Sequence, residues 1–194
     1  VVFGAFHPQN DLDLLREAFE KGIDGLKLHP SVQIFRPDSS EALRIYDVLE
    51  ELQKPLYIHT GWFPDNGFLY SAPEQFEPLI RNYSFPVILA HMCHGKSEAI
   101  TDFFDARENV YSDTSNVMTD FTFKDKTRKI EWKSERAVHI IEEYPDRIMY
   151  GSEIPLMWRR PEEVYENLVK HFDDGLLEKL LHKNAERFIE KYII

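Results

Sequence analysis

Four side chains that can bind a metal ion or move protons each stand at the end of a short apolar segment. They are His29, His59, His91 and Glu153, and the segments before them cover residues 25–28, 56–58, 87–90 and 148–152. Neutral imidazole and carboxylate groups are zinc ligands, and both also serve as general acids and bases. Their types and positions predict a metal-dependent or acid–base site, provided that the fold brings them together.

The apolar segments indicate strands because a helix-like segment follows each one. We predict strands at residues 1–6, 23–28, 56–59, 86–91, 109–112 and 147–150, and helices at 11–21, 39–52, 74–83, 97–107, 132–144, 162–172, 176–181 and 185–192. We find no hairpin signal between strands, so the alternation predicts a parallel sheet in one domain over residues 1–194, either a closed barrel or an open doubly wound sheet. Because the carboxyl ends of parallel strands meet at one edge, the four side chains are expected to converge there.

Each candidate for metal and proton chemistry also has a structural interpretation. His59 is a metal ligand or a buried histidine satisfied by a backbone carbonyl. His91 binds the metal, or it acts beside the metal as an acid or base. Glu153 ligates the metal and accepts a proton, or it only caps backbone amides. We expect His94 to support the loop after residue 91 rather than to bind metal.

A second set of residues could hold a substrate. Lys27 and His29 lie two residues apart on one strand, so they share a face and could bind a carboxylate; alternatively Lys27 pairs with a neighbouring acid. Arg36 could clamp a carboxylate from its loop, or stay solvated, and the same holds for Arg159 and Arg160. Trp62, with Phe63 and Phe68, could wall a pocket for a planar substrate or pack the loop down.

Composition limits the classes of function. The 194 residues are 43% hydrophobic and 29% charged, as in globular proteins, and the net charge of −11 argues against nucleic acid or anionic lipid as partner. No apolar stretch approaches the ~20 residues of a membrane span. The single cysteine, Cys93, excludes an intrachain disulfide and favours a reducing, cytoplasmic location. Nothing would orient a base for Cys93, so we do not expect it to be a nucleophile.

Several motifs in order carry a family resemblance. They are Gly22-Ile-Asp-Gly-Leu-Lys-Leu-His-Pro30 with Gln33, Pro55-Leu-Tyr-Ile-His-Thr-Gly61, Ile88-Leu-Ala-His91, Tyr150-Gly-Ser-Glu-Ile-Pro155 and Asn184-Ala-Glu-Arg187. Together they resemble the amidohydrolase superfamily, in the amidohydrolase-2 branch that is similar to aminocarboxymuconate-semialdehyde decarboxylase. The resemblance implies a (β/α)₈ TIM-type barrel with one divalent metal, usually zinc, at its mouth. It implies that His59 is a metal ligand, that His91 is a ligand or catalytic group, and that Glu153 completes the site.

The chain departs from the family pattern in two respects. The family's first strand carries a His-x-His pair of ligands, whereas strand 1–6 here aligns with the family's third strand. We therefore expect about six of the eight strand–helix units here, with the first two missing and the polypeptide continuing upstream of Val1. The acid at Glu153 is normally an aspartate, so this side chain is one methylene longer and must tilt to reach the same metal.

The expected function is a metal-dependent hydrolase or decarboxylase acting on a small carboxylate-bearing substrate. The expected metal ligands are His59, His91 and Glu153, the catalytic residues are His91 and Glu153, and the substrate-binding residues are Lys27, His29, Arg36 and Trp62. One zinc ion is the expected cofactor, the partner is a small molecule without nucleic acid or membrane, and a homo-oligomer is compatible with the sequence. Two alternatives stay open: a TatD-like metal-dependent phosphoesterase, and a degenerate barrel that binds a ligand or partner without turnover.

Overall fold

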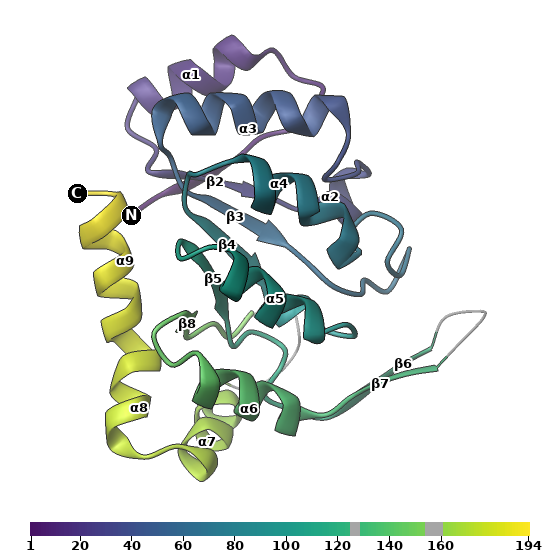
Figure 1. Ribbon diagram of the computed structural model, residues 1–194, viewed down its shortest axis with the longest axis vertical. Coiled ribbons are helices and arrows are strands. Elements are labelled where there is room, and N and C mark those ends of the chain that lie inside the picture. The colour runs from purple at the N-terminus through teal and green to yellow at the C-terminus, as the bar shows by residue number, and fades with distance from the viewer. Residues whose placement is uncertain (125–128, 154–160) are drawn as a thin grey trace.

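A six-stranded parallel sheet is the centre of the molecule (Figure 1). The computed structural model describes residues 1–124, 129–153 and 161–194. The strands, in their order across the sheet, are β1 (Phe3–Ala5), β2 (Gly25–Leu28), β3 (Leu56–His59), β4 (Val87–Ala90), β5 (Val110–Asp113) and β8 (Ile148–Met149). All five neighbouring pairs run parallel, so the carboxyl ends of the strands share one edge of the sheet, as predicted.

Helices connect successive strands and cover one face of the sheet (Figure 1). They are α1 (Leu12–Glu20), α2 (Pro30–Gln33), α3 (Ser40–Leu52), α4 (Glu77–Asn82) after a 3₁₀ turn at Pro73–Phe76, α5 (Glu98–Ala106) after a 3₁₀ turn at His91–Cys93, and α6 (Ser134–Glu143). After β8 come α7 (Pro161–His171), α8 (Asp174–Glu178), a π-helical turn at Lys179–Lys183 and α9 (Asn184–Tyr192).

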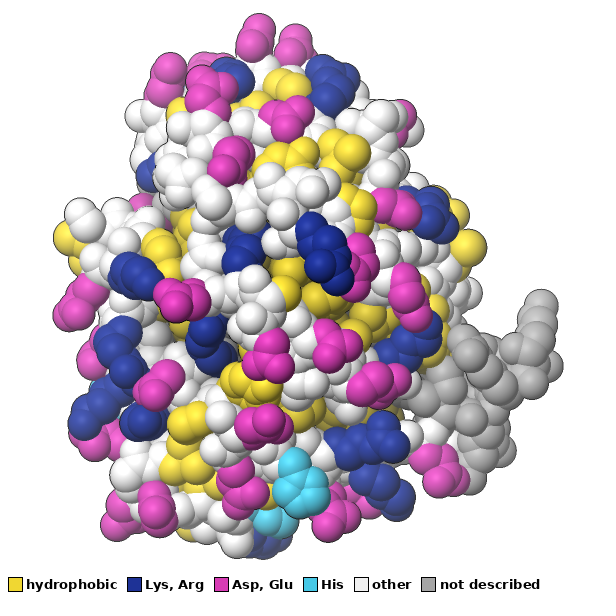
Figure 2. Space-filling view, in the orientation of Figure 1, with side chains coloured by type: hydrophobic (Ala, Val, Ile, Leu, Met, Phe, Trp, Pro, Cys, Tyr) yellow, Lys and Arg dark blue, Asp and Glu magenta, His cyan; other side chains and the backbone are white. Residues whose placement is uncertain are grey.

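The main core lies between the sheet and these helices. Alternate strand residues point to this side, and they pack against the apolar stripes of the helices. The buried set includes Leu26, Leu28, Leu56, Ile58, Val87, Leu89 and Val110 from the strands, and Leu15, Ile45, Leu49, Leu79, Ile100 and Ile141 from the helices. The outer surface of the helical layer carries acidic and basic side chains side by side (Figure 2).

The opposite face of the sheet is covered in part by α9. Phe188 of α9 lies edge-on to Tyr111 of β5, with ring centroids 5.0 Å apart. The buried side chains of this smaller cluster are Ile88, Met149 and Phe188, and Phe3, Tyr57 and Tyr111 pack against them. These contacts lie mostly at the first or second residue of each strand, so α9 leaves the carboxyl ends of the strands to the loops.

Strands β1 and β8 are the two edges of the sheet. Within the described residues β1 pairs with β2 alone and β8 with β5 alone. An open, six-stranded parallel sheet with helical crossovers is the arrangement expected for six units of a (β/α)₈ barrel.

One prediction about the fold is wrong. The segment after β5 forms an antiparallel hairpin of β6 (Phe121–Lys124) and β7 (Lys129–Trp132), which extends away from the sheet (Figure 1). Trp132, predicted as the start of a helix, therefore lies in β7, and its indole N–H donates to the Val117 carbonyl at 2.7 Å. The sequence between the strands, Asp125-Lys-Thr-Arg128, has none of the Asn-Gly or Asp-Gly pairs that short hairpins favour, so the turn gave no signal.

None of the described helices combines the length and the apolar composition that crossing a membrane requires.

Candidate metal and acid–base site

The structure brings His29, His59, His91 and Glu153 together at the carboxyl edge of the sheet. The rings of His29 and His59 stack with centroids 4.0 Å apart and 9° between their planes. The His91 ring lies 5.0 Å from that of His59. Nε2 of His91 lies 3.5 Å from Oε1 of Glu153. These contacts join residues from the ends of β2, β3, β4 and β8.

His59 is buried with both ring nitrogens unsatisfied. Its side chain is 3% exposed, and neither Nδ1 nor Nε2 has a hydrogen-bond partner in the described part of the chain. Burial, followed by the charges of His91 and His29, holds the pKa of His59 well below its ordinary value. The ring is therefore neutral and keeps a free lone pair, which is the form that binds metal. The alternative of a histidine satisfied by a backbone carbonyl is not what the structure shows.

His91 stands in an unusual backbone conformation and has a defined partner. Its φ is 65°, and Met92 and Cys93 continue the left-handed turn with φ of 47° and 52°. Nδ1 contacts two oxygens of Ser115, the hydroxyl at 2.8 Å and the carbonyl at 3.1 Å. The ring is thus held at Nδ1, while Nε2 faces Glu153.

Asp113, which ends β5, is a buried carboxylate of this site that sequence reasoning missed. Its carboxylate is 4% exposed and accepts hydrogen bonds from the Tyr57 hydroxyl at 2.5 Å, the Ser115 amide at 2.8 Å and the His91 amide at 3.4 Å. The predicted strand ended at residue 112, one residue too early. Applied to the true end of β5, the same strand-end rule that selected His59 would have selected Asp113.

Lys27 supplies a half-buried cation next to this group. Its Nζ lies 3.6 Å from the centre of the Tyr57 ring, a cation–π contact. Burial lowers the pKa of Lys27 to about 8, and the charges of Asp113 and Glu153 oppose the shift. Lys27 therefore stays protonated at neutral pH and could hold an anion.

His29 caps the short helix α2 as well as stacking on His59. Its Nδ1 accepts from the Val32 amide at 3.3 Å, and its own amide donates to Oε1 of Gln33 at 2.7 Å. Burial, followed by the charges of Lys27 and His91, lowers the pKa of His29 to about 4. The ring is therefore neutral at pH 7, and the side chain as a whole is half-buried.

The other two predicted substrate-binding residues, Arg36 and Trp62, do not line the site. Arg36 donates to both carboxylate oxygens of Asp38, at 2.9 and 2.7 Å, in a separate pocket of about 310 Å³ that Tyr70 also lines. Trp62 is 5% exposed and its carbonyl accepts from Nε2 of His94 at 2.7 Å, so it packs the loop. Phe63 is the aromatic residue that reaches the site, edge-on to His29 at 5.1 Å.

Two further predictions can be placed. Arg159 and Arg160 lie outside the described residues. Cys93 is fully buried as a free thiol, and burial raises its pKa to about 12, so it stays protonated and is not an activated nucleophile.

The residues at the mouth fit a divalent metal in donor chemistry. In residues 1–124, 129–153 and 161–194 no three His, Cys, Asp or Glu side chains already surround one metal position. However, the unsatisfied nitrogens of buried His59 and the facing Nε2 and Oε1 of His91 and Glu153 are the ligand types that zinc and manganese accept. His59, His91 and Glu153 are the residues that would hold the ion.

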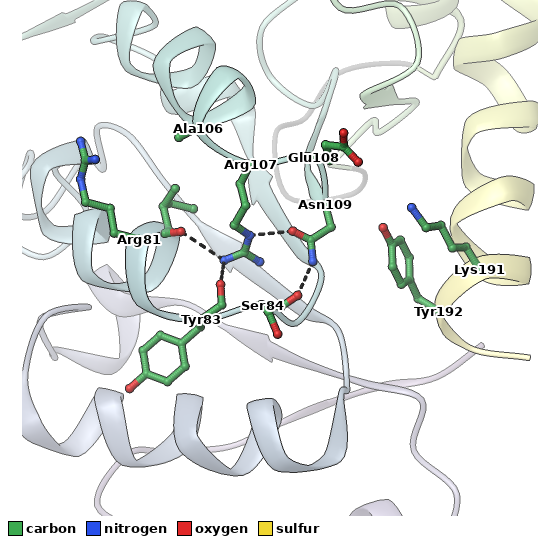
Figure 3. A pocket seen from close by; sticks show the side chains of 10 residues that line it. Arg81, Tyr83, Ser84, Ala106, Arg107, Glu108, Asn109, Lys191 and Tyr192 are labelled. Atoms are coloured by element: carbon green, nitrogen blue, oxygen red, sulfur yellow. Dashed lines mark hydrogen bonds between the residues drawn. The ribbon is translucent and has the colours of Figure 1, made fainter.

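A pocket of about 710 Å³ lies at the opposite end of the sheet, near the starts of β4 and β5 (Figure 3). Its most prominent cation, Arg107, donates to the carbonyls of Leu79 and Tyr83 and, through Nε, to Oδ1 of Asn109 at 2.6 Å. These bonds occupy the guanidinium of Arg107. The side chain therefore links the segments that lead into β4 and β5, and it does not present its charge to an anion in the pocket.

The fold and the mouth define a partial (β/α)₈ barrel with an imidazole-rich site at its carboxyl edge. A family model described as amidohydrolase, of the amidohydrolase-2 branch, matches residues 3–190, and the chain belongs to this family. The predicted family and barrel class are thereby confirmed. No curated protein sequence matches the chain.

Solved structures share the barrel at low sequence identity. An uncharacterized TIM-barrel protein from Bordetella bronchiseptica is 19% identical, with a TM-score of 0.76, and the match covers 97% of this chain and 65% of that one. A dihydroxybenzoic acid decarboxylase from a Polaromonas species, solved with manganese and 2-nitroresorcinol, is 15% identical, with a TM-score of 0.66, and the match covers 95% and 66%. A 5-carboxyvanillate decarboxylase from Sphingomonas paucimobilis is 17% identical, with a TM-score of 0.65, and the match covers 99% and 66%. The chain thus spans about two thirds or less of the length of these relatives.

Proposed function

We propose that the protein is a metal-dependent carboxy-lyase or hydrolase that acts on a small aromatic carboxylate. The observation that carries the proposal is the pair of unsatisfied, buried nitrogens on His59 beside the facing His91 and Glu153. Membership of the amidohydrolase family supports the reaction class. The decarboxylase relatives, one of them with bound manganese, favour carboxy-lyase over hydrolase and leave manganese as well as zinc as the cofactor.

The residues at the mouth divide the work. Lys27, a cation at neutral pH, binds the carboxylate of the substrate, and the edge of Phe63 with the His29 ring bounds its aromatic ring. His59 and Glu153, with His91 as a further ligand, would hold a metal ion, and this ion would supply polarisation of a substrate oxygen or a water molecule. His91 has two alternative roles, because its single Nε2 lone pair either ligates the metal or accepts a proton. In the second role, Nε2 of His91 and Oε1 of Glu153, 3.5 Å apart, would pass the proton to or from the reacting atom.

A metal titration of two matched variants tests the proposal. The His59→Asn variant is expected to lose most of its bound zinc or manganese, whereas His139→Asn, at an exposed position in α6, keeps it. Metal content is measured by elemental analysis after gel filtration. Equal metal in the two variants would contradict the metal site.

A substrate panel tests the reaction. Hydroxybenzoates, carboxyvanillate-like acids and pyrone dicarboxylates are incubated with metal-loaded protein, with separate assays for released CO₂ and for ring-opened acid. The proposal predicts CO₂ release from a hydroxybenzoate. Turnover of phosphate esters alone would favour the phosphoesterase alternative.

One observation favours a second candidate, a barrel that binds a ligand without turnover. The His29 and His59 rings stack face to face, and no three His, Cys, Asp or Glu side chains in the described part of the chain converge on one point. Tight binding of an aromatic carboxylate with neither metal nor product formation would support this candidate.

A further inference from the structure

Ser115 presents two oxygens to a single nitrogen of His91. Its hydroxyl lies 2.8 Å and its carbonyl 3.1 Å from Nδ1, and both residues are buried, at 3% and 4% exposure. A carbonyl oxygen only accepts hydrogen bonds, so its contact with Nδ1 requires a proton on that nitrogen. The hydroxyl is consistent with this, because it donates its own proton to Oδ1 of Asp113 and is left as an acceptor towards Nδ1.

Asp113 holds Ser115 in the position that makes both contacts. Its Oδ1 accepts from the Ser115 amide, two residues on, at 2.8 Å, which is the bond of an Asx-turn. The other oxygen, Oδ2, accepts from the Tyr57 hydroxyl at 2.5 Å. Burial raises the pKa of Tyr57, so this phenol stays protonated and remains a donor. Both oxygens of the Asp113 carboxylate are therefore held by hydrogen bonds.

The backbone after β8 packs closely against this turn at Gly151. A Cβ at Gly151 would lie 3.1 Å from Cβ of Ser115 and 3.3 Å from Cβ of Asp113. The Thr114 hydroxyl donates to the Gly151 carbonyl at 3.1 Å and accepts from its amide at 3.0 Å. Thr114, the residue between Asp113 and Ser115, is thus bonded to the segment that leads from β8 to Glu153.

We propose that Asp113 and Ser115 are positioning residues that keep His91 in its Nδ1–H tautomer and leave the Nε2 lone pair facing Glu153. The importance of this tautomer for turnover rests on the role of His91 in the proposed function. The tautomer itself does not depend on that role. A neutral ring with an open Nε2 can accept a proton or ligate a metal at that nitrogen alone, and at no other.

Nitrogen NMR of the full chain, labelled with ¹⁵N-histidine, tests the proposal at neutral pH. The His91 signal is assigned by its loss in a His91→Gln variant. In the wild type Nδ1 should be protonated and Nε2 unprotonated. Asp113→Asn should keep this pattern, because an amide oxygen can replace Oδ1 as acceptor and the amide group can donate to the Tyr57 hydroxyl. Asp113→Ala removes the acceptor and should give a mixture of tautomers.

Each outcome decides a separate question. A wild-type His91 protonated at Nε2, either alone or together with Nδ1, would overturn the proposal, and this outcome needs no variant to be folded. An unchanged Nδ1–H signature in folded Asp113→Ala, with melting checked by circular dichroism, would overturn the role of Asp113. A mixed signature accompanied by a 10–100-fold fall in kcat supports both the positioning network and the proposed function. A mixed signature with unchanged kcat supports the network and contradicts His91 as the proton carrier.

Discussion

Nε2 of His91 lies 3.5 Å from Oε1 of Glu153, and both residues have a left-handed backbone, with φ of 65° and 56°. Side chains other than glycine rarely adopt this region, and each such residue costs about 1–3 kcal/mol. Two such residues that face each other at the ends of β4 and β8 indicate that the surrounding structure enforces the contact. Strain of this kind is typical of functional sites.

The first prediction concerns the charge of Glu153. Replacing it with Gln keeps the shape but removes the carboxylate that faces Nε2 of His91, so kcat on the best substrate should fall at least about 100-fold. The melting temperature should change little, because glutamine has nearly the same volume and shape as glutamate. Glu142→Gln, at an exposed position of α6, is the matched control. Activity within threefold of the control would remove Glu153 from the mechanism.

The second prediction follows from the lowered pKa of Lys27, which lies at about 8. The ammonium is present below this pH and is lost above it, so affinity for an aromatic carboxylate should weaken as pH rises from 7 to 9.5. A Lys27→Arg variant keeps its charge over this range and should bind with a flat pH profile. Isothermal titration with 2,6-dihydroxybenzoate measures both. A wild-type profile as flat as that of the arginine variant would place the anion elsewhere.

The third prediction concerns acid stability of the metal-free protein. Burial lowers the pKa of His94 to about 3, far below the ordinary value of 6.5. Between these values the unfolded chain takes up a proton that the folded chain refuses, so stability falls as the pH decreases from 6.5 towards 3. One histidine contributes a slope of up to about 1.4 kcal/mol per pH unit.

His94→Gln removes one group that takes up a proton on unfolding, so the stability of the variant depends less on pH. The amide nitrogen of the glutamine can still donate to the Trp62 carbonyl. Urea unfolding at several pH values, with a chelator present, should therefore show a shallower acid slope for His94→Gln than for His139→Gln at the exposed position. Parallel slopes in the two variants would show that His94 is protonated in the folded state.

The sequence predicted which side chains meet at the carboxyl edge of the sheet in those cases where a histidine directly follows an apolar strand. His59 and His91 were found because each closes an uninterrupted apolar segment, and the structure gives both segments as strands ending at that point or one residue before it. Asp113 was missed because the boundary of β5 was placed one residue short, which is the usual error for element ends.

The remaining parts of the network depend on tertiary geometry. In the sequence, Tyr57 is simply one residue of an apolar strand, with no sign of a polar partner. Its hydrogen bond to Asp113 joins β3 to β5, which lie on either side of β4. The two oxygens of Ser115 reach His91 only because the turn after β5 is held by Asp113. Arg36 could not be excluded from the mouth by sequence, since its pairing with Asp38 is a local side-chain choice.

The last prediction compares two glycines that differ in surroundings but share a left-handed backbone. Gly61, which follows His59 and Thr60, has φ of 93°, and a Cβ there would lie 2.7 Å from the carbonyl oxygen and 2.8 Å from the amide nitrogen of His94. Gly22 has φ of 99° and nothing within 4 Å of such a Cβ. Both alanine variants incur the conformational cost of about 1 kcal/mol.

Only Gly61→Ala must in addition displace the backbone of the His94 loop, which packs next to His59. It should lower the free energy of unfolding by clearly more than Gly22→Ala, by about 2 kcal/mol or more in total, and should weaken metal binding. Denaturant unfolding and metal titration of the two variants measure these effects. Equal stability of the two variants would mean that the loop after β4 moves away at no cost. The close approach of Gly61 to His94 would then not contribute to the position of the site residues.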